Sequence, residues 1–211
     1  VWALMQFVSM PVLGAISDRF GRRPVILISN FGLGFDYLMM AMAQNIWWLL
    51  AGRIISGICA ASFSTANAYV ADVTAPEKRA QVFGYMGAAF GFGFILGPAL
   101  GGILGDIDPR LPFVVAGVLS LINAMYGLFV LPESLAPENR RPFSIKTANP
   151  MDALQFLASK PAMFGLSAVR FLENLAHIVF PSAFVLLAGH RYGWGPKEVG
   201  LTLAFVGVSS M

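Results

Sequence analysis

The sequence predicts an all-α integral membrane protein, and three observations support this fold class. Hydrophobic residues make up 57% of the 211 residues and charged residues only 12%. Average soluble domains hold about 45–50% apolar and about 25% charged residues, so a soluble core of this size could not bury so much apolar surface. The apolar residues also gather in runs close to the ~20 residues that a helix needs to cross a bilayer. Most charged residues lie between these runs.

Seven apolar segments are expected to be membrane helices, of which the first and last are short or truncated. They are Val1–Ile16, Pro24–Ala43, Ile46–Val70, Val82–Leu104, Pro112–Leu131, Met163–Ala188 and Val199–Met211. We expect an N-terminal helical bundle over residues 1–131, a polar linker over 132–161 and the start of a C-terminal bundle over 162–211. Since the chain begins without Met and stops inside an apolar run, we expect it to be a fragment.

The distribution of lysine and arginine predicts how the segments are oriented. One side collects Arg19, Arg22, Arg23, Lys78, Arg79, Arg140, Arg141, Lys146 and Lys160, and the other holds Arg110, Arg191 and Lys197. The positive-inside rule places the first side, and with it the linker, in the cytoplasm. The small net charge of +3 is explained by this orientation and does not indicate nucleic-acid binding. The single Cys59 lies in an apolar run, so neither a disulfide nor a thiolate metal site is expected.

A compact basic turn joins the first two segments, and its residues are Gly14, Asp18, Arg19, Gly21, Arg22, Arg23 and Pro24. Gly14 would let another helix pack closely, Gly21 permits the turn, and Pro24 suits the first position of the next helix. Asp72, at the end of the third segment, falls on the same face of the membrane. We predict that Asp72 meets the turn through Arg22, with Arg23 as the alternative. Asp18 is expected to point toward the second bundle and to have no partner in this chain.

Asp36 lies inside the second segment, flanked by Gly32, Gly34 and Tyr37. An ionisable residue at that depth is a functional candidate by default. The alternative is a structural ion pair with Arg53 of the third segment. At about 1.5 Å of rise per residue, both would lie roughly 10 Å below the outer surface. Both interpretations remain open at this point.

Glycines recur every four residues in the fourth segment, at Gly93, Gly97, Gly101 and Gly105. Such a stripe permits close helix packing, and Pro98 within it favours a kink. In the sixth segment Arg170, Glu173 and His177 share one helical face. This face either lines a substrate path or holds an ion pair near the cytoplasmic end. No further His or Cys joins it at ligand spacing, so no metal site is expected.

These motifs resemble those of the major facilitator superfamily. The turn is similar to that family's loop between its second and third helices. The third segment, with Gly52-Arg53-Ile-Ile-Ser-Gly57 and Tyr69-Val-Ala-Asp72, resembles the fourth helix of the family's drug exporters. The run that contains Gly93, Gly97, Pro98, Gly101 and Gly102 resembles the fifth-helix signature of the proton-coupled drug antiporters. The resemblance implies a partial major facilitator fold that covers family helices two to eight.

Within the family the resemblance is strongest to the tetracycline-resistance efflux group, through Ala3-Leu-Met-Gln6, the turn, Asp36-Tyr37 and Phe90-Gly-Phe-Gly93. By position it implies that Gln6 contacts substrate, that Asp36 serves the substrate and proton path, and that Arg53 is essential. That group exchanges a metal–tetracycline complex for protons. A divalent metal would therefore arrive with the substrate, and no resident cofactor is expected. The sixth segment, with Arg170 and Glu173, departs from the group, which favours drug export in general over tetracycline itself.

The resemblance thus implies a non-enzymatic, proton-coupled drug antiporter of the bacterial inner membrane. It would work as a monomer in the lipid bilayer by alternating access, with a small-molecule drug and protons as its partners. Two alternatives remain. One is a facilitator-family exporter of another metabolite, such as a sugar or a siderophore. The other is a membrane protein that binds or senses a ligand and does not transport it.

Overall fold

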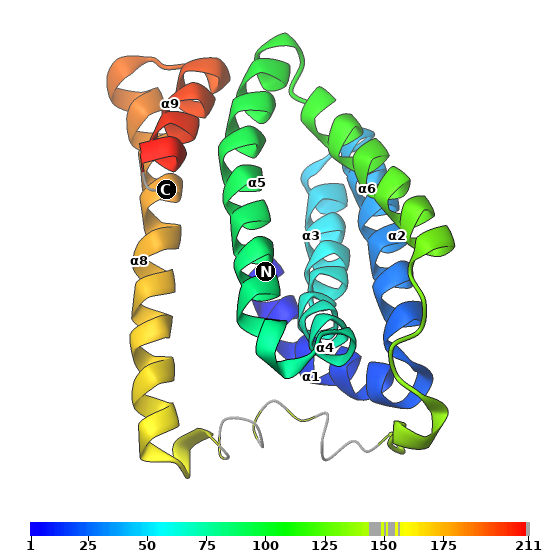
Figure 1. Ribbon diagram of the computed structural model, residues 1–211. Coiled ribbons are helices and arrows are strands. Elements are labelled where there is room, and N and C mark those ends of the chain that lie inside the picture. The colour runs from blue at the N-terminus through cyan, green and yellow to red at the C-terminus, as the bar shows by residue number, and fades with distance from the viewer. Residues whose placement is uncertain (144–148, 150, 152–154, 156, 210–211) are drawn as a thin grey trace. The chain divides into compact units, whose positions relative to one another are not determined.

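The computed structural model describes residues 1–143, 149, 151, 155 and 157–209, and every regular element among them is helical (Figure 1). The helices are α1 (Trp2–Phe20), α2 (Arg22–Ala41), α3 (Ile46–Ala60), α4 (Phe63–Val73), α5 (Arg79–Ile107), α6 (Leu111–Val130), α8 (Pro161–Tyr192) and α9 (Pro196–Ser209). Short 3₁₀ turns lie at η1 (Pro76–Lys78) and η2 (Pro137–Asn139). The predicted linker residue Lys146 and the last residue, Met211, lie outside the described residues.

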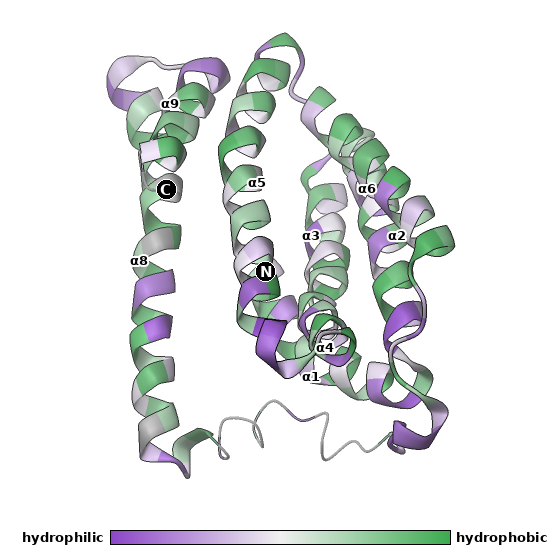
Figure 2. Cartoon of the chain, in the orientation of Figure 1, coloured by the Kyte–Doolittle hydropathy of each residue, from purple (hydrophilic) through white to green (hydrophobic). Residues whose placement is uncertain are grey.

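Within the described residues, five helical stretches are long and apolar enough to cross a membrane. They are Arg22–Ala41, Ile46–Val73, Pro76–Ile107, Leu111–Val130 and Met163–Tyr192. The first and last predicted segments form α1 and α9, which have 19 and 14 residues and are not in this set. Figure 2 shows apolar residues along most of the helical surface and polar residues mainly where helices end. The predicted all-α, multi-pass membrane protein is therefore confirmed.

The helices group into two compact units, which are described separately. The first consists of Val1–Val82 with Phe113–Ala153, and the second of Phe83–Pro112 with Leu154–Met211. These units are sets of contacting helices. The division into two bundles and a linker stays a prediction from the sequence.

In the first unit α3 packs against both α1 and α2, and small residues set the helix spacing. A Cβ added to Gly57 of α3 would lie 2.6 Å from the Trp2 carbonyl oxygen of α1. One added to Gly34 of α2 would lie 2.6 Å from Leu121 Cδ2 of α6. Both distances are too short for a methyl group, so glycine allows these helices to approach one another closely.

In the second unit α5 and α9 approach each other through Gly102 and Gly200. A Cβ added to Gly102 would lie 2.9 Å from Gly200 Cα. No described atom lies within 4 Å of a Cβ added at Gly93, Gly97 or Gly101, so the predicted stripe does not make the close contact here. Adjacent helical residues point about 100° apart, which explains why Gly102 and not Gly101 faces α9.

The turn between α1 and α2 differs from the prediction in two details. α2 begins at Arg22, so Pro24 is its third residue and not its first. Among the described residues, nothing lies within 4 Å of a Cβ built on Gly14, so close helix packing there stays a prediction. Gly21 has φ of 108°, a backbone conformation that strongly favours glycine, and its role in the turn is confirmed.

Candidate functional site

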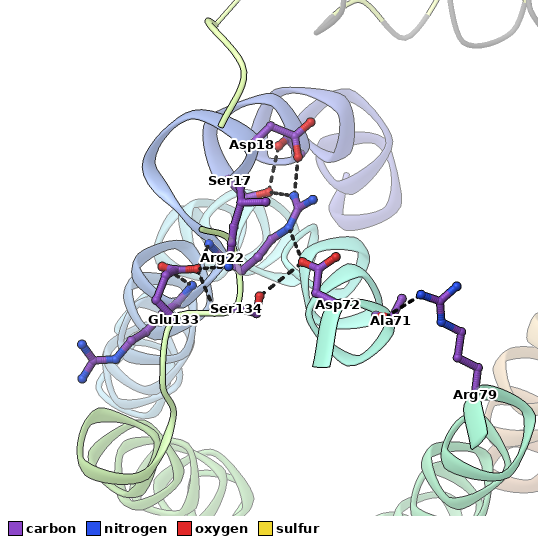
Figure 3. A network of polar contacts seen from close by, with 11 residues as sticks. Ser17, Asp18, Arg22, Ala71, Asp72, Arg79, Glu133 and Ser134 are labelled. Atoms are coloured by element: carbon purple, nitrogen blue, oxygen red, sulfur yellow. Dashed lines mark hydrogen bonds and ion pairs between the residues drawn. The ribbon is translucent and has the colours of Figure 1, made fainter. Parts of the chain in front are cut away.

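Arg22 is the centre of a polar network at the end of α1, the start of α2 and the end of α4 (Figure 3). Its Nη1 donates to Ser17 Oγ at 2.7 Å and pairs with the Asp18 carboxylate. Its Nε donates to Asp72 Oδ2 at 3.4 Å. The Arg22 side chain is only 14% exposed, so these partners replace most of its hydration. We call this set the turn network.

The predicted contact between Asp72 and Arg22 is confirmed, whereas the prediction for Asp18 is wrong. Asp18 lies four residues before Arg22, so the arginine folds back over the turn and binds both carboxylates at once. Arg23, the predicted alternative partner of Asp72, instead donates from Nη2 to the Leu128 carbonyl at 2.6 Å, near the end of α6. Arg23 thereby stabilises the negative end of the α6 dipole. Arg19 is exposed and lies over the Phe20 ring, with 5.1 Å from Cζ to the ring centroid.

Glu133, whose role the sequence interpretation missed, binds the start of α2 from 111 residues away. Its Oε1 accepts from the backbone N–H of Arg22 at 2.8 Å, and its Oε2 accepts from that of Arg23 at 3.3 Å. The first N–H groups of a helix lack intrahelical partners, and a carboxylate there also favours the helix dipole. Gly21 offers no side-chain cap, which is the one local sign that an acceptor must come from elsewhere.

Glu133→Ala is expected to lower the unfolding free energy of the full-length protein by about 1–2 kcal/mol, because two helix N–H groups lose their acceptor. The measurement is the thermal unfolding midpoint of the purified protein in detergent. Glu138→Ala is the matched control, since this exposed glutamate lies in the same segment and its loss is expected to change the midpoint little. An equal shift in both variants would contradict a capping role for Glu133.

The segment that follows α6 also binds the turn network. Ser134 Oγ donates to Asp72 Oδ2 at 3.2 Å, and the Arg141 N–H donates to the Asp18 carbonyl at 3.0 Å. A polar cavity of about 420 Å³ lies here, lined by Asp18, Arg22, Asp72, Leu135, Asn139 and Arg141. The network therefore ties together the ends of four helices, α1, α2, α4 and α6. It can act as a latch whose strength depends on how these ends are placed.

Asp36 is 2% exposed, and among the described residues neither carboxylate oxygen has a hydrogen-bond partner. It faces α3 at Gly52, where an added Cβ would lie 3.0 Å from Oδ1. Arg53 is exposed, and no ion pair joins it to Asp36 in the part of the chain that the structure describes. The two side chains therefore form no direct ion pair among the described residues. Arg53 follows Gly52 directly and lies about 100° further round α3.

Three other candidate residues, Gln6, Arg170 and Glu173, have hydrogen-bond or ion-pair partners. Gln6 Nε2 donates to the Ala60 carbonyl of α3 at 3.5 Å. In the second unit, Arg170 Nη1 lies 2.7 Å from Glu173 Oε2. This corresponds to the ion-pair alternative, and with side chains 72% and 60% exposed it contributes little to stability. The His177 side chain lies outside those described. No group of three or more His, Cys, Asp or Glu among the described residues could hold a metal ion.

Comparison with known proteins agrees with this architecture. The chain is 42% identical over 208 residues to tetracycline resistance protein, class C, from Escherichia coli, which covers 99% of this chain and 52% of that protein. It is 37% identical over 219 residues to the class D protein from Salmonella ordonez, covering 98% of this chain and 52% of that protein. Multidrug resistance protein 2 from Bacillus subtilis (strain 168) is 30% identical over 212 residues, and the match covers 100% of this chain and 52% of that protein.

A solved transporter structure has a similar helical fold. The crystal structure of the human organic anion transporter MFSD10 (TETRAN) is similar with a TM-score of 0.76 and 27% identity, over 99% of this chain and 52% of that one. The chain thus spans about half the length of the relatives that it matches. The family model of the Major Facilitator Superfamily matches residues 1–211 of this chain. The chain belongs to the Major Facilitator Superfamily, whose members are membrane transporters and not enzymes.

Proposed function

We propose that this chain forms part of a proton-coupled antiporter that exports a drug, tetracycline-like in its chemistry, across the bacterial inner membrane. The observation that carries the proposal is Asp36, a carboxylate buried inside a membrane-length helix with no hydrogen-bond partner for either oxygen among the described residues. Burying an unpaired charge is expensive, and retaining one in a membrane helix usually reflects function. The similarity to tetracycline resistance proteins supports the substrate class.

Asp36 is suited to couple protons to conformation. Its carboxylate faces the bare backbone of Gly52, and no hydrogen bond among the described residues compensates its charge. Binding a proton removes that charge, and releasing the proton restores it. A conformation that hydrates the residue therefore stabilises the charged form, whereas the buried arrangement stabilises the neutral form. Proton binding would in this way favour one access state over the other.

The turn network would set the balance between these states. Its ion pairs are partly exposed, since Asp18 and Asp72 are 39% and 30% exposed, and each contributes only about 1 kcal/mol or less. Such a contribution is small for folding but sufficient to change the ratio of two conformations several-fold. In alternating access the helix bundles rock about a substrate site near the membrane midplane. The latch would favour the conformation in which the described helix ends stay together.

The remaining features of the proposal come from the sequence and its resemblance. The proton gradient supplies the energy, no resident cofactor is needed, and a divalent metal would enter as part of the transported complex. The linker at 132–161 would lie in the cytoplasm, as the positive-inside rule predicts. The protein would act as a monomer.

The test uses everted membrane vesicles that contain the full-length protein, energised by an imposed proton gradient. We expect uptake of tetracycline with Mg²⁺, or of another drug in a panel, to stop when a protonophore dissipates the gradient. Vesicles without the protein are the control. Uptake of a sugar or siderophore in place of drugs would favour the exporter of another metabolite. Binding without any gradient-driven uptake would contradict antiport and favour a sensor.

A further inference from the structure

The membrane span over Ile46–Val73 is interrupted near its centre. α3 contributes 15 residues and ends at Ala60, and α4 contributes 11 and begins at Phe63. Between them the Ala61 N–H donates to the Ile58 carbonyl at 3.2 Å, and the Ser62 N–H to the Cys59 carbonyl at 3.1 Å. Both bonds reach back three residues and not four, so the chain tightens into a 3₁₀ turn. In Figure 1 the ribbon of α4 does not continue the line of α3.

Two side chains donate hydrogen bonds to carbonyls at this interruption. Gln6 Nε2, from α1, donates to Ala60 O at 3.5 Å, and Ser64 Oγ donates to Ala61 O at 2.9 Å. The last carbonyls of a helix have no intrahelical partner, and the hydrocarbon of a bilayer supplies none. Gln6 therefore stabilises the interrupted conformation, whereas the Ser64 bond reaches three residues back and is equally available in a continuous helix.

Thr65 has the opposite preference. Its side chain is 1% exposed, and Oγ1 has no hydrogen-bond partner among the described residues. In a continuous helix a threonine hydroxyl can donate to the carbonyl four residues earlier, which here is Ala61. Straightening the span would let Thr65 donate to Ala61 and would restore backbone bonds to the fourth residue back, at the expense of the Gln6 contact.

We propose that Ala61–Ser62 is a hinge with two conformations, and that Gln6 is a positioning residue that holds the hinge in its interrupted form. The 3.5 Å bond is long, so the contact is weak enough to be exchanged. A substrate group that donates a hydrogen bond to the Ala60 carbonyl, or accepts one from the Gln6 amide, would release it. Only this last step rests on the proposed function. The hinge itself requires no particular substrate.

The position of the hinge gives it a mechanical consequence. On one side of it Gly52 of α3 faces Asp36, and on the other Asp72 of α4 binds Arg22 in the turn network. A change of angle at Ala61–Ser62 alters the position of Asp72 relative to Gly52. Discontinuous helices near the midplane are a recurring element of transporters, where their unwound backbone carbonyls can bind ions or substrate. The hinge thus links the buried carboxylate to the latch along one span.

The test measures the distance between the two ends of the span in the full-length protein. Spin labels are placed at the exposed positions Trp47 and Val73, and Cys59 is replaced by Ala with any other cysteines. A straight span separates its ends more than a bent one. Gln6→Leu is expected to raise the ratio of long to short distances, by less than the roughly fivefold change that one ordinary hydrogen bond produces, because the bond is long. Ser64→Ala should leave the ratio unchanged, since its bond is available in both conformations.

Thr65→Val is expected to lower that ratio, because valine has the shape of threonine without the hydroxyl that favours the straight form. Ser9→Ala, about one α1 turn from Gln6, is the matched control and should leave the distances unchanged. Equal distance distributions in the parent, Gln6→Leu and Thr65→Val would overturn the proposal. So would a Gln6→Leu variant that raises the apparent KM for drug with no change in distance, since Gln6 would then act on substrate directly. Loss of vesicle transport alone would contradict the proposed function and leave the hinge standing.

Discussion

Asp36→Asn is expected to reduce proton-driven efflux in vesicles to the level seen without the protein, while the full-length protein inserts normally. The amide preserves the shape of the side chain but cannot exchange a proton, so coupling is lost. Because the carboxylate has no hydrogen-bond partner among the described residues, removing its charge should leave the thermal unfolding midpoint unchanged or raise it. Uptake in everted vesicles and the unfolding midpoint are measured on the same preparation.

Arg53→Gln provides the control for a purely structural role of Asp36. If Asp36 only neutralised Arg53, then the double variant Asp36→Asn with Arg53→Gln would transport normally. The structure places Arg53 on an exposed face of α3 without an ion pair to Asp36 in the described part of the chain, so we expect the double variant to remain inactive. Recovery of transport in it would sink the functional interpretation of Asp36.

Arg22→Ala is expected to have the largest effect on the turn network, lowering the unfolding free energy by about 1–3 kcal/mol and slowing efflux. The variant leaves the Asp18 and Asp72 carboxylates without their shared cation and removes the donor to Ser17. Arg22→Lys should recover only part of the loss, because an ammonium group lacks the planar fork of donors that reaches several partners at once.

Arg19→Ala is the matched control for Arg22→Ala. Both arginines lie in the same turn, but Arg19 is exposed and lies over the neighbouring Phe20 ring. Its replacement should change stability by no more than about 0.5 kcal/mol. The thermal unfolding midpoint in detergent and the vesicle efflux rate are compared for the three variants. Equal losses for Arg19→Ala and Arg22→Ala would show that only the net charge of the turn matters.

The sequence by itself determined the features that depend on local pattern. Apolar runs of membrane length predict the helices, and their ends agree with the structure to within a few residues, as in α6 over Leu111–Val130. The basic turn at Gly21 and the pairing of Asp72 with Arg22 also followed from the sequence. Both depend on chain direction and membrane side, which the order of the segments and the positive-inside rule constrain.

Only the tertiary structure decided how the helices are rotated about their axes. The rotation of α3 turns Gly52 toward Asp36, whereas Arg53 lies about 100° further round the helix and is exposed. Counting depth along the membrane normal cannot detect this difference of one residue. Glu133 reaches α2 across 111 residues, and no local pattern encodes such a contact. The interruption at Ala61–Ser62 escaped prediction for the same reason. Its carbonyls are satisfied partly by Gln6 from another helix, so its stability depends on how α1 packs against α3 and not on propensity within the span.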